Sequence, residues 1–206
     1  MFVPTNIQAA ELEKLLSKTC PNIQITVFPR VKDFMTQVAA NKPVAILAMV
    51  PTIKHIATYK MILEGKRQGN SAESYLMVSV DKALDLTQLA TSKIGVLDIL
   101  GRKQMKVFMS SLLGSSSKLK RVIKQEDLLP LLSFNSVDAI FVSESLYSEL
   151  KANSQLNLVT TPLEAKVGLA SIASMEDTAN SALVGCVMQW ENGLKLSLGV
   201  DQWAKR

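Results

Sequence analysis

Two apolar strands limit what this chain can fold into. VAILAMV (Val44–Val50) carries no polar side chain, and SFNSVDAIFVSES (Ser133–Ser145) holds a second apolar strand between polar ends. A strand that is apolar on both faces must be covered on both faces, which is typical of a parallel sheet between helices. Helical periodicity comes before each strand. We therefore predict an α/β fold in which polar residues follow each buried strand.

The first 50 residues or so predict a β-α-β-α-β series. The start, MFVPT, has the pattern of a strand end, and Thr5 or Asn6 follows as a helix N-cap. Pro43 ends the second helix of the series. After the opening strand, the expected elements are a helix over Asn6–Lys18, a strand over Gln24–Phe28, a helix over Val31–Lys42 and the strand Val44–Val50.

A second α/β series follows two strand-like runs within Tyr59–Val80. Pro130 should kink or shorten one of its helices. Near the end, a long helical pattern from about Thr178 to Trp203 should return to the first lobe to bury its apolar side chains. The expected elements are strands over Lys93–Asp98, Lys118–Ile123, Val137–Ser143, Leu156–Leu163 and Val167–Ser174, and helices over Arg102–Gly114 and Gln125–Phe134.

Composition and charge exclude several classes of protein. Of the 206 residues, 48% are hydrophobic, which indicates a globular chain, and no apolar run approaches the roughly 20 residues of a membrane-spanning helix. The net charge of +5 comes from scattered Lys and Arg. Their densest cluster, Lys118–Lys124, alternates like a solvated edge strand, so we expect no nucleic-acid partner.

The sequence has no motif for metal binding, cofactor binding or nucleophilic catalysis. Cys20 and Cys186 have no metal-ligand spacing, and His55 is the one histidine, so we expect neither metal nor cofactor. The two cysteines can be buried thiols or, in an oxidising compartment, a disulfide, and the sequence leaves both open. GxSxG, GxGxxG and P-loop patterns are absent, so we do not expect an enzyme.

The order of elements resembles the type II periplasmic solute-binding proteins, and within them the phosphate/phosphonate-binding group of ABC transporters. VAILAMVPTI (Val44–Ile53) and EDLLPLLSFNSVDAIFVSESLYSEL (Glu126–Leu150) carry the resemblance. The segment LDILGRKQ (Leu97–Gln104) departs from that group, because it lacks the Ser and Thr of the usual anion-binding turn. The resemblance implies two lobes, two crossover strands and a C-terminal helix that returns to lobe 1. Lobe 1 would hold residues 1–78 and 164–206, and lobe 2 residues 79–163.

On such a fold, ligands bind beyond the carboxyl ends of the strands, where helix N-termini point their N–H groups. Several candidates also have structural interpretations: the threonines and Asn6 as helix N-caps, Asp98 as the cap of the helix after Gly101, and Tyr75 as a packing residue. Arg102 can chelate a carboxylate or phosphate. The expected ligand contacts are Thr5, Asn6, Thr52, Tyr75, Asp98, Arg102, Ser143 and Glu144.

The resemblance implies a monomeric, periplasmic binding protein. It would capture a small anion between two closing lobes and deliver it to an ABC transporter permease or a membrane sensor. The start, MFVPTN, has no secretory signal, which fits either a mature domain without its leader or a cytoplasmic protein. Two alternatives share the fold: the ligand-sensing domain of a LysR-type regulator, and a cofactor-biosynthesis enzyme that would use Asp98 or Glu144 for proton transfer.

Overall fold

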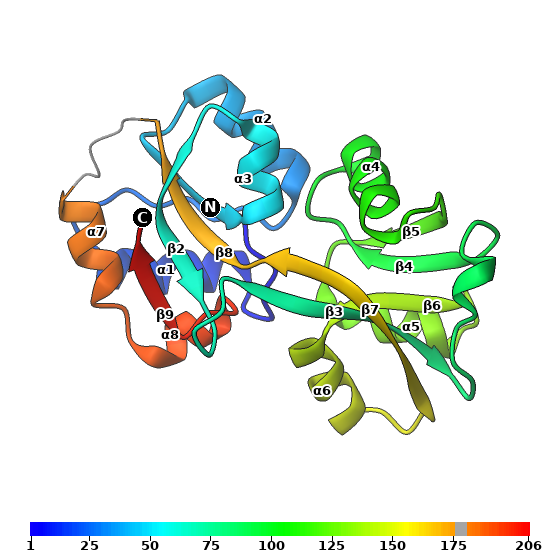
Figure 1. The fold of residues 1–206 in the computed structure, drawn as a ribbon. Coiled ribbons are helices and arrows are strands. Elements are labelled where there is room, and N and C mark those ends of the chain that lie inside the picture. Colours follow the sequence, from blue (N-terminus) through cyan, green and yellow to red (C-terminus); the bar gives the residue numbers. More distant parts are fainter. Residues whose placement is uncertain (176–180) are drawn as a thin grey trace. The chain divides into compact units, whose positions relative to one another are not determined.

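The chain forms two α/β units in a computed structural model that describes residues 1–175 and 181–206. Unit 1 contains Met1–Ala72 and Gly168–Arg206, and unit 2 contains Glu73–Val167. The chain therefore passes between the units twice, once at the start of strand β3 and once at the end of strand β7 (Figure 1).

Unit 1 is built on a four-stranded sheet in the order β1-β8-β2-β9. In Figure 1, α2 and α3 lie at the upper end of this sheet, α1 runs behind it, α7 lies at its left and α8 at its lower end. Helices on both sides give the apolar strand β1 the cover that its sequence requires. The elements are α1 (Ala9–Thr19), α2 (Val31–Asn41), β1 (Ala45–Met49), α3 (Val50–Ile56), β2 (Lys60–Lys66), β8 (Ala170–Ser174), α7 (Ser181–Met188), α8 (Asn192–Ser197) and β9 (Gln202–Lys205).

The helix α1 packs through a narrow apolar stripe. Leu12 and Leu16, four residues apart on one helix face, are fully buried. Burial of each leucine side chain contributes about 1.5 to 3 kcal/mol relative to an exposed position. Glu11 lies in the first turn and Lys18 in the last, as the helix dipole favours.

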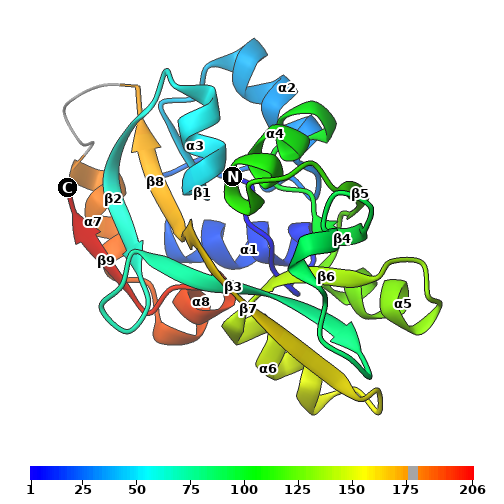
Figure 2. The same cartoon turned by 45° about the vertical axis from the view of Figure 1, so that its right-hand side comes forward.

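Unit 2 is built on a five-stranded sheet in the order β5-β4-β6-β3-β7. Strand β4 is parallel to both β5 and β6, whereas β3 is antiparallel to β6. Figure 2 shows α4 above the sheet and α5 and α6 below it. The elements are β3 (Ala72–Val80), η1 (Leu86–Gln88), β4 (Lys93–Leu97), α4 (Arg102–Leu113), β5 (Lys118–Val122), η2 (Gln125–Asp127), α5 (Leu128–Ser133), β6 (Ala139–Ser143), α6 (Glu144–Ala152) and β7 (Leu158–Gly168).

Strand β6 is the centre of unit 2. All five of its residues are buried, since helices cover both faces of the sheet. Ile140 and Val142 pack in one cluster with Leu128 and Leu132 of α5 and Leu150 of α6. The predicted parallel arrangement is therefore confirmed for β4, β5 and β6, and β5 is the edge strand that its lysines predicted.

Several sequence predictions about local structure are wrong. Residues 24–28 form no strand, because their backbone meets Met1 through the Phe28 N–H and the Thr26 carbonyl rather than a neighbouring strand. Strand β1 is antiparallel to β8, and among the described residues its parallel contact is an isolated bridge between Phe2 and Ala48. The N-cap of α1 is Gln8 rather than Thr5 or Asn6.

A further error concerns the C-terminal segment. Instead of one long helix to Trp203, the described residues form α7, α8 and the edge strand β9, which pairs with β2. Gly199 has a φ of 78° after α8, a left-handed conformation that ends the helix. The predicted start of the helix, Thr178, lies outside the described residues. The predicted return to the first lobe is confirmed, because Gly168–Arg206 belongs to unit 1.

A disulfide links the N-terminal and C-terminal segments that make up unit 1. Cys20, just after α1, is bonded to Cys186 of α7 across 166 residues of sequence, with a Cα–Cα distance of 5.9 Å. The indole N–H of Trp190 donates a hydrogen bond to the Cys20 sulfur at 3.3 Å. Of the two alternatives that the sequence left open, the structure therefore has the disulfide.

Candidate functional site

Five predicted ligand contacts meet at one edge of the unit 2 sheet. Strands β4 and β6 are parallel neighbours, with Val96 opposite Phe141, so their carboxyl ends reach the same edge. Asp98 and Arg102 follow β4, and Ser143 and Glu144 lie where β6 becomes α6. Tyr75 of antiparallel β3 is the register partner of Ser143. The topology therefore brings the unit 2 candidates together, as the order of elements predicted.

The N-terminus of α6 is held by side chains of the protein itself. The Ser143 hydroxyl accepts a hydrogen bond from the Leu146 N–H at 3.3 Å, which makes Ser143 the N-cap, and lies 3.1 Å from the Ser145 hydroxyl. Glu73, at the start of β3, accepts a hydrogen bond from the Ser145 N–H at 2.9 Å. A carboxylate thus occupies the position at which we expected a bound anion.

The sequence pattern does not identify Glu73 as part of this site. A glutamate at the first positions of a strand has no local signal of a site, because charged residues are common where strands meet solvent. Its partner Ser145 is distant in sequence and becomes adjacent through the β3–β6 pairing. Glu144, by contrast, is exposed in the first turn of α6, where a negative charge suits the helix dipole.

Asp98 has a structural role, although it is not the N-cap of α4 that its position before Gly101 suggested. One carboxylate oxygen accepts a hydrogen bond from the Gly101 N–H at 2.7 Å, and the other forms an ion pair with Arg121 of β5. Gly101 is the N-cap of α4, with a φ of 78° that favours glycine. Asp98 therefore fixes the turn between β4 and α4.

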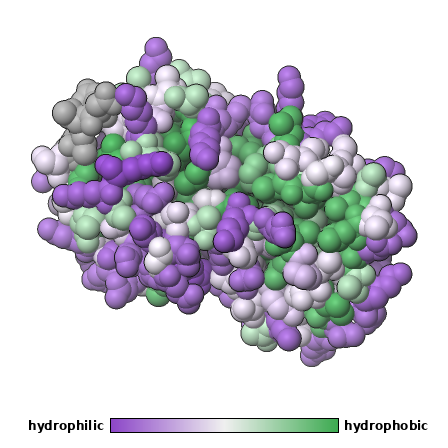
Figure 3. Space-filling view, viewed as in Figure 1, coloured by the Kyte–Doolittle hydropathy of each residue, from purple (hydrophilic) through white to green (hydrophobic). Residues whose placement is uncertain are grey.

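Arg102 is the first residue of α4 and is exposed. Among the residues that the structure describes, its guanidinium forms no hydrogen bond or ion pair. Figure 3 shows an apolar surface over β4 and the adjoining end of α4, with hydrophilic side chains around it. An exposed guanidinium of this kind can bind the anionic group of a small molecule.

Tyr75 combines a packed ring with a neutral hydroxyl. Its ring lies 4.8 Å from that of Phe141, centroid to centroid. Burial, with the nearby Glu73 carboxylate as a smaller cause, raises the pKa of Tyr75 well above its ordinary value. The phenol therefore stays protonated into the alkaline range and can donate a hydrogen bond.

Thr5, Asn6 and Thr52 belong to unit 1. The parallel bridge of Phe2 to Ala48 makes the segments that carry them leave the sheet at the same edge. The Thr5 hydroxyl accepts a hydrogen bond from the Ile7 N–H at 3.3 Å, and Asn6 is exposed. Thr52 is fully buried inside α3, whose N-cap is Met49, so its predicted N-cap role is wrong.

Two other kinds of site are absent from residues 1–175 and 181–206. No group of three or more His, Cys, Asp or Glu side chains lies where it could hold a metal ion. None of the described helices is both long enough and apolar enough to span a bilayer.

Comparison with known proteins identifies the fold through structure alone. No family model matches the chain, and no curated protein matches its sequence significantly. XAC2383 from Xanthomonas citri, in a structure bound to ATP, matches with a TM-score of 0.64 at 12% identity, over 93% of this chain and 83% of that one. The chain has the two-lobed periplasmic-binding-protein fold.

Two amino-acid-binding proteins match over similar lengths. AbpA, an amino acid ABC transporter substrate-binding protein from Streptococcus pneumoniae bound to L-arginine, has a TM-score of 0.57 at 14% identity, over 92% of this chain and 80% of that one. An arginine-bound variant of ArgBP from T. maritima has a TM-score of 0.55 at 12% identity, over 93% and 84% of the two chains.

Proposed function

We propose that this protein binds a small solute at the strand-end edge of unit 2 and delivers it to an ABC transporter permease or a membrane sensor. The observation that carries the proposal is the convergence of Arg102, Tyr75 and Ser143 at the carboxyl ends of β4 and β6. Ligands of open α/β sheets bind at such edges. A binding role, rather than catalysis, fits the set of side chains gathered there.

The charges at this edge favour a zwitterionic solute over a simple anion. Arg102 offers a free guanidinium to a carboxylate, and Glu73, at the start of β3, adds a carboxylate at the same edge. The Asp98 carboxylate is already paired with Arg121. A phosphate or phosphonate would meet the negative charge of Glu73, and the Ser145 N–H that it would use is taken by that carboxylate. An amino acid, as bound by AbpA and ArgBP, supplies both charges.

The disulfide supports an oxidising compartment such as the periplasm. Disulfides persist outside the cytoplasm and are rare within it. The bond between Cys20 and Cys186 therefore favours a periplasmic binding protein over the cytoplasmic LysR-type sensor. Thr5, Asn6 and Thr52 stay predicted ligand contacts, and we propose a monomer.

A thermal-shift panel tests the proposal. The chain is melted with amino acids, other carboxylates, phosphate, phosphonates and sulfate, each in large excess. A bound solute at about 100 times its Kd stabilises the folded state by about 2.7 kcal/mol, which is a shift of several degrees. A shift with one amino acid supports the proposal, whereas no shift with any solute contradicts it.

A further inference from the structure

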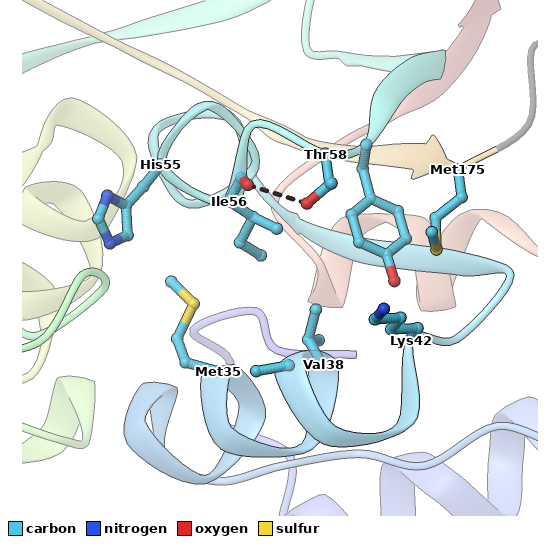
Figure 4. Close-up of a pocket in the computed structure, with 9 residues that line it drawn as sticks. Met35, Val38, Lys42, His55, Ile56, Thr58 and Met175 are labelled. Carbon is cyan, nitrogen blue, oxygen red and sulfur yellow. Dashed lines mark hydrogen bonds between the residues drawn. The ribbon is translucent and has the colours of Figure 1, made fainter.

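A separate pocket lies within unit 1, at the edge of its sheet opposite to Thr5 and Thr52. Ala45 at the start of β1 and Lys60 at the start of β2 both pair with Ser174, next to Met175, whereas Met49 at the other end of β1 pairs with Ala170. The pocket has a volume of about 330 Å³ and opens to solvent (Figure 4). Its lining is Met35, Val38, Ala39, Lys42, His55, Ile56, Thr58, Tyr59 and Met175.

Most of the wall is apolar and adaptable. Figure 4 shows Val38 and Met35 on one side, Ile56 facing them, and Met175 at the far side from His55. Methionine side chains adjust their shape to irregular ligands, because they are unbranched and polarisable. A volume near 300 Å³ is at the small end for ligand pockets, which limits the occupant to a compact molecule.

The two hydroxyl groups of the pocket already have acceptors. The Tyr59 hydroxyl donates to the Pro43 carbonyl at 2.7 Å, and the Thr58 hydroxyl donates to the Ile56 carbonyl at 3.0 Å. Within the described residues, the Lys42 ammonium and the His55 ring form no hydrogen bond or ion pair. None of the described lining residues is a carboxylate, and Lys42 is the one among them with a fixed positive charge.

Lys42 is held at the pocket by an unusual backbone conformation. It is the C-cap of α2 with a φ of 43°, in the left-handed region that favours glycine or asparagine. Its N–H donates to the Val38 carbonyl at 3.0 Å, which closes the last turn of the helix. A residue with a Cβ atom costs about 1 kcal/mol relative to glycine in this conformation, and residues with such backbone strain cluster at ligand sites.

We infer that this pocket binds a small monocarboxylate with a compact apolar body. The carboxylate pairs with the Lys42 ammonium, and the apolar body lies between Met35, Val38 and Ile56 and extends toward His55. A neutral molecule of the same shape would lack the ion pair, and an ammonium would be repelled. The inference does not depend on the proposed function, because its residues share none with the edge of unit 2.

The test uses the full chain with ¹³C-labelled methionine methyl groups, titrated with hexanoate, hexanamide and hexylammonium. The Met35 and Met175 signals, assigned with Met35→Leu and Met175→Leu, should shift saturably with hexanoate. They should shift less with hexanamide and least with hexylammonium. The Met105 and Met109 signals of unit 2 should stay in place and show that the chain is folded.

Variants then test whether Lys42 binds the carboxylate and whether the pocket holds the apolar body. Lys42→Gln should weaken hexanoate binding about tenfold, the value of one charge-assisted hydrogen bond. Lys54→Gln, which removes an equal charge from an exposed position of α3 outside the lining, should leave binding unchanged, and Ala39→Leu should abolish it by filling the pocket. The inference is overturned if hexanoate moves neither methionine, if the three probes bind alike, or if Lys42→Gln and Lys54→Gln have equal effects.

Discussion

Glu73 accepts a hydrogen bond from the Ser145 N–H at 2.9 Å, so a carboxylate at the start of β3 caps the first turn of α6. This contact joins the entry of the chain into unit 2 to the helix that follows its central strand. A negative charge at a helix N-terminus is stabilised both by the N–H groups and by the helix dipole.

Replacement of Glu73 should therefore cost stability. We expect Glu73→Ala to lower the free energy of unfolding by about 1 to 2 kcal/mol, because the Ser145 N–H loses its acceptor and the helix loses a favourable charge. Glu73→Gln keeps an acceptor and should cost less. Urea unfolding measures both, with Glu149→Gln, at an exposed position late in α6, as the control. Equal stability of Glu73→Ala and the unchanged chain would contradict the role.

The disulfide should be a large contributor to the stability of unit 1. Because it closes a loop of 166 residues, its loss should lower the free energy of unfolding by about 2 to 5 kcal/mol. Thermal melting of the unchanged chain with and without dithiothreitol, and of the Cys20→Ser/Cys186→Ser variant, measures the effect. The variant should have a lower melting temperature than the unchanged chain, and dithiothreitol should not change it. Free thiols in the folded, unreduced protein would show that the bond does not form.

Two glycines of unit 1 should respond in opposite ways to alanine. A Cβ at Gly65 would lie 2.0 Å from the Ala170 carbonyl oxygen of the paired strand β8, so Gly65→Ala should cost about 2 to 4 kcal/mol by forcing the strands apart. Gly185, in the exposed face of α7, has nothing within 4 Å of an added Cβ. Gly185→Ala should stabilise the protein by about 0.5 to 1 kcal/mol. Chemical unfolding measures the stability of both variants. If Gly65→Ala leaves the free energy of unfolding unchanged, the close packing of β2 against β8 is contradicted.

The raised pKa of Tyr75 predicts a loss of stability at alkaline pH. In the unfolded chain this phenol ionises near a pH of about 10, whereas burial keeps it neutral to higher pH in the folded chain. Its contribution is therefore complete below about pH 10 and disappears as the pH rises through the folded-state pKa. Absorbance at about 295 nm follows the ionisation of the tyrosines, and the component that titrates at the highest pH should be missing in Tyr75→Phe. The stability of that variant should fall less steeply as the pH rises. If the component that is missing in Tyr75→Phe titrates at the ordinary pKa of tyrosine, the burial of Tyr75 is refuted.

The sequence predicted most of unit 2 because its signals are local. The apolar run Ala139–Val142 and the helical spacing of Arg102–Leu113 each need cover on defined faces, and the structure supplies it. The same reasoning gave the wrong partner for VAILAMV, because an apolar strand reports that both faces are covered and does not report the direction of its neighbours. The run Gln24–Phe28 has strand-like residues and no strand beside it.

The candidate site was predicted in position and less well in chemistry. Residues after β4 and β6 could be named because parallel strands end at one edge. The contacts of each side chain there depend on partners distant in sequence. Arg121 forms an ion pair with one oxygen of Asp98, and Glu73 accepts the hydrogen bond of the Ser145 N–H that an anion would use. Such pairings follow from strand register, which single-sequence patterns do not fix.

The most direct test of the central claim is isothermal titration calorimetry with the solute that gives the largest thermal shift. The unchanged chain should bind one equivalent saturably. Arg102→Gln should weaken binding by about tenfold or more, because a bidentate ion pair is lost. Lys103→Gln, one residue further along α4 and also exposed, should bind as the unchanged chain does. Equal affinities in all three proteins, or no binding at all, would contradict a solute site at this edge of unit 2.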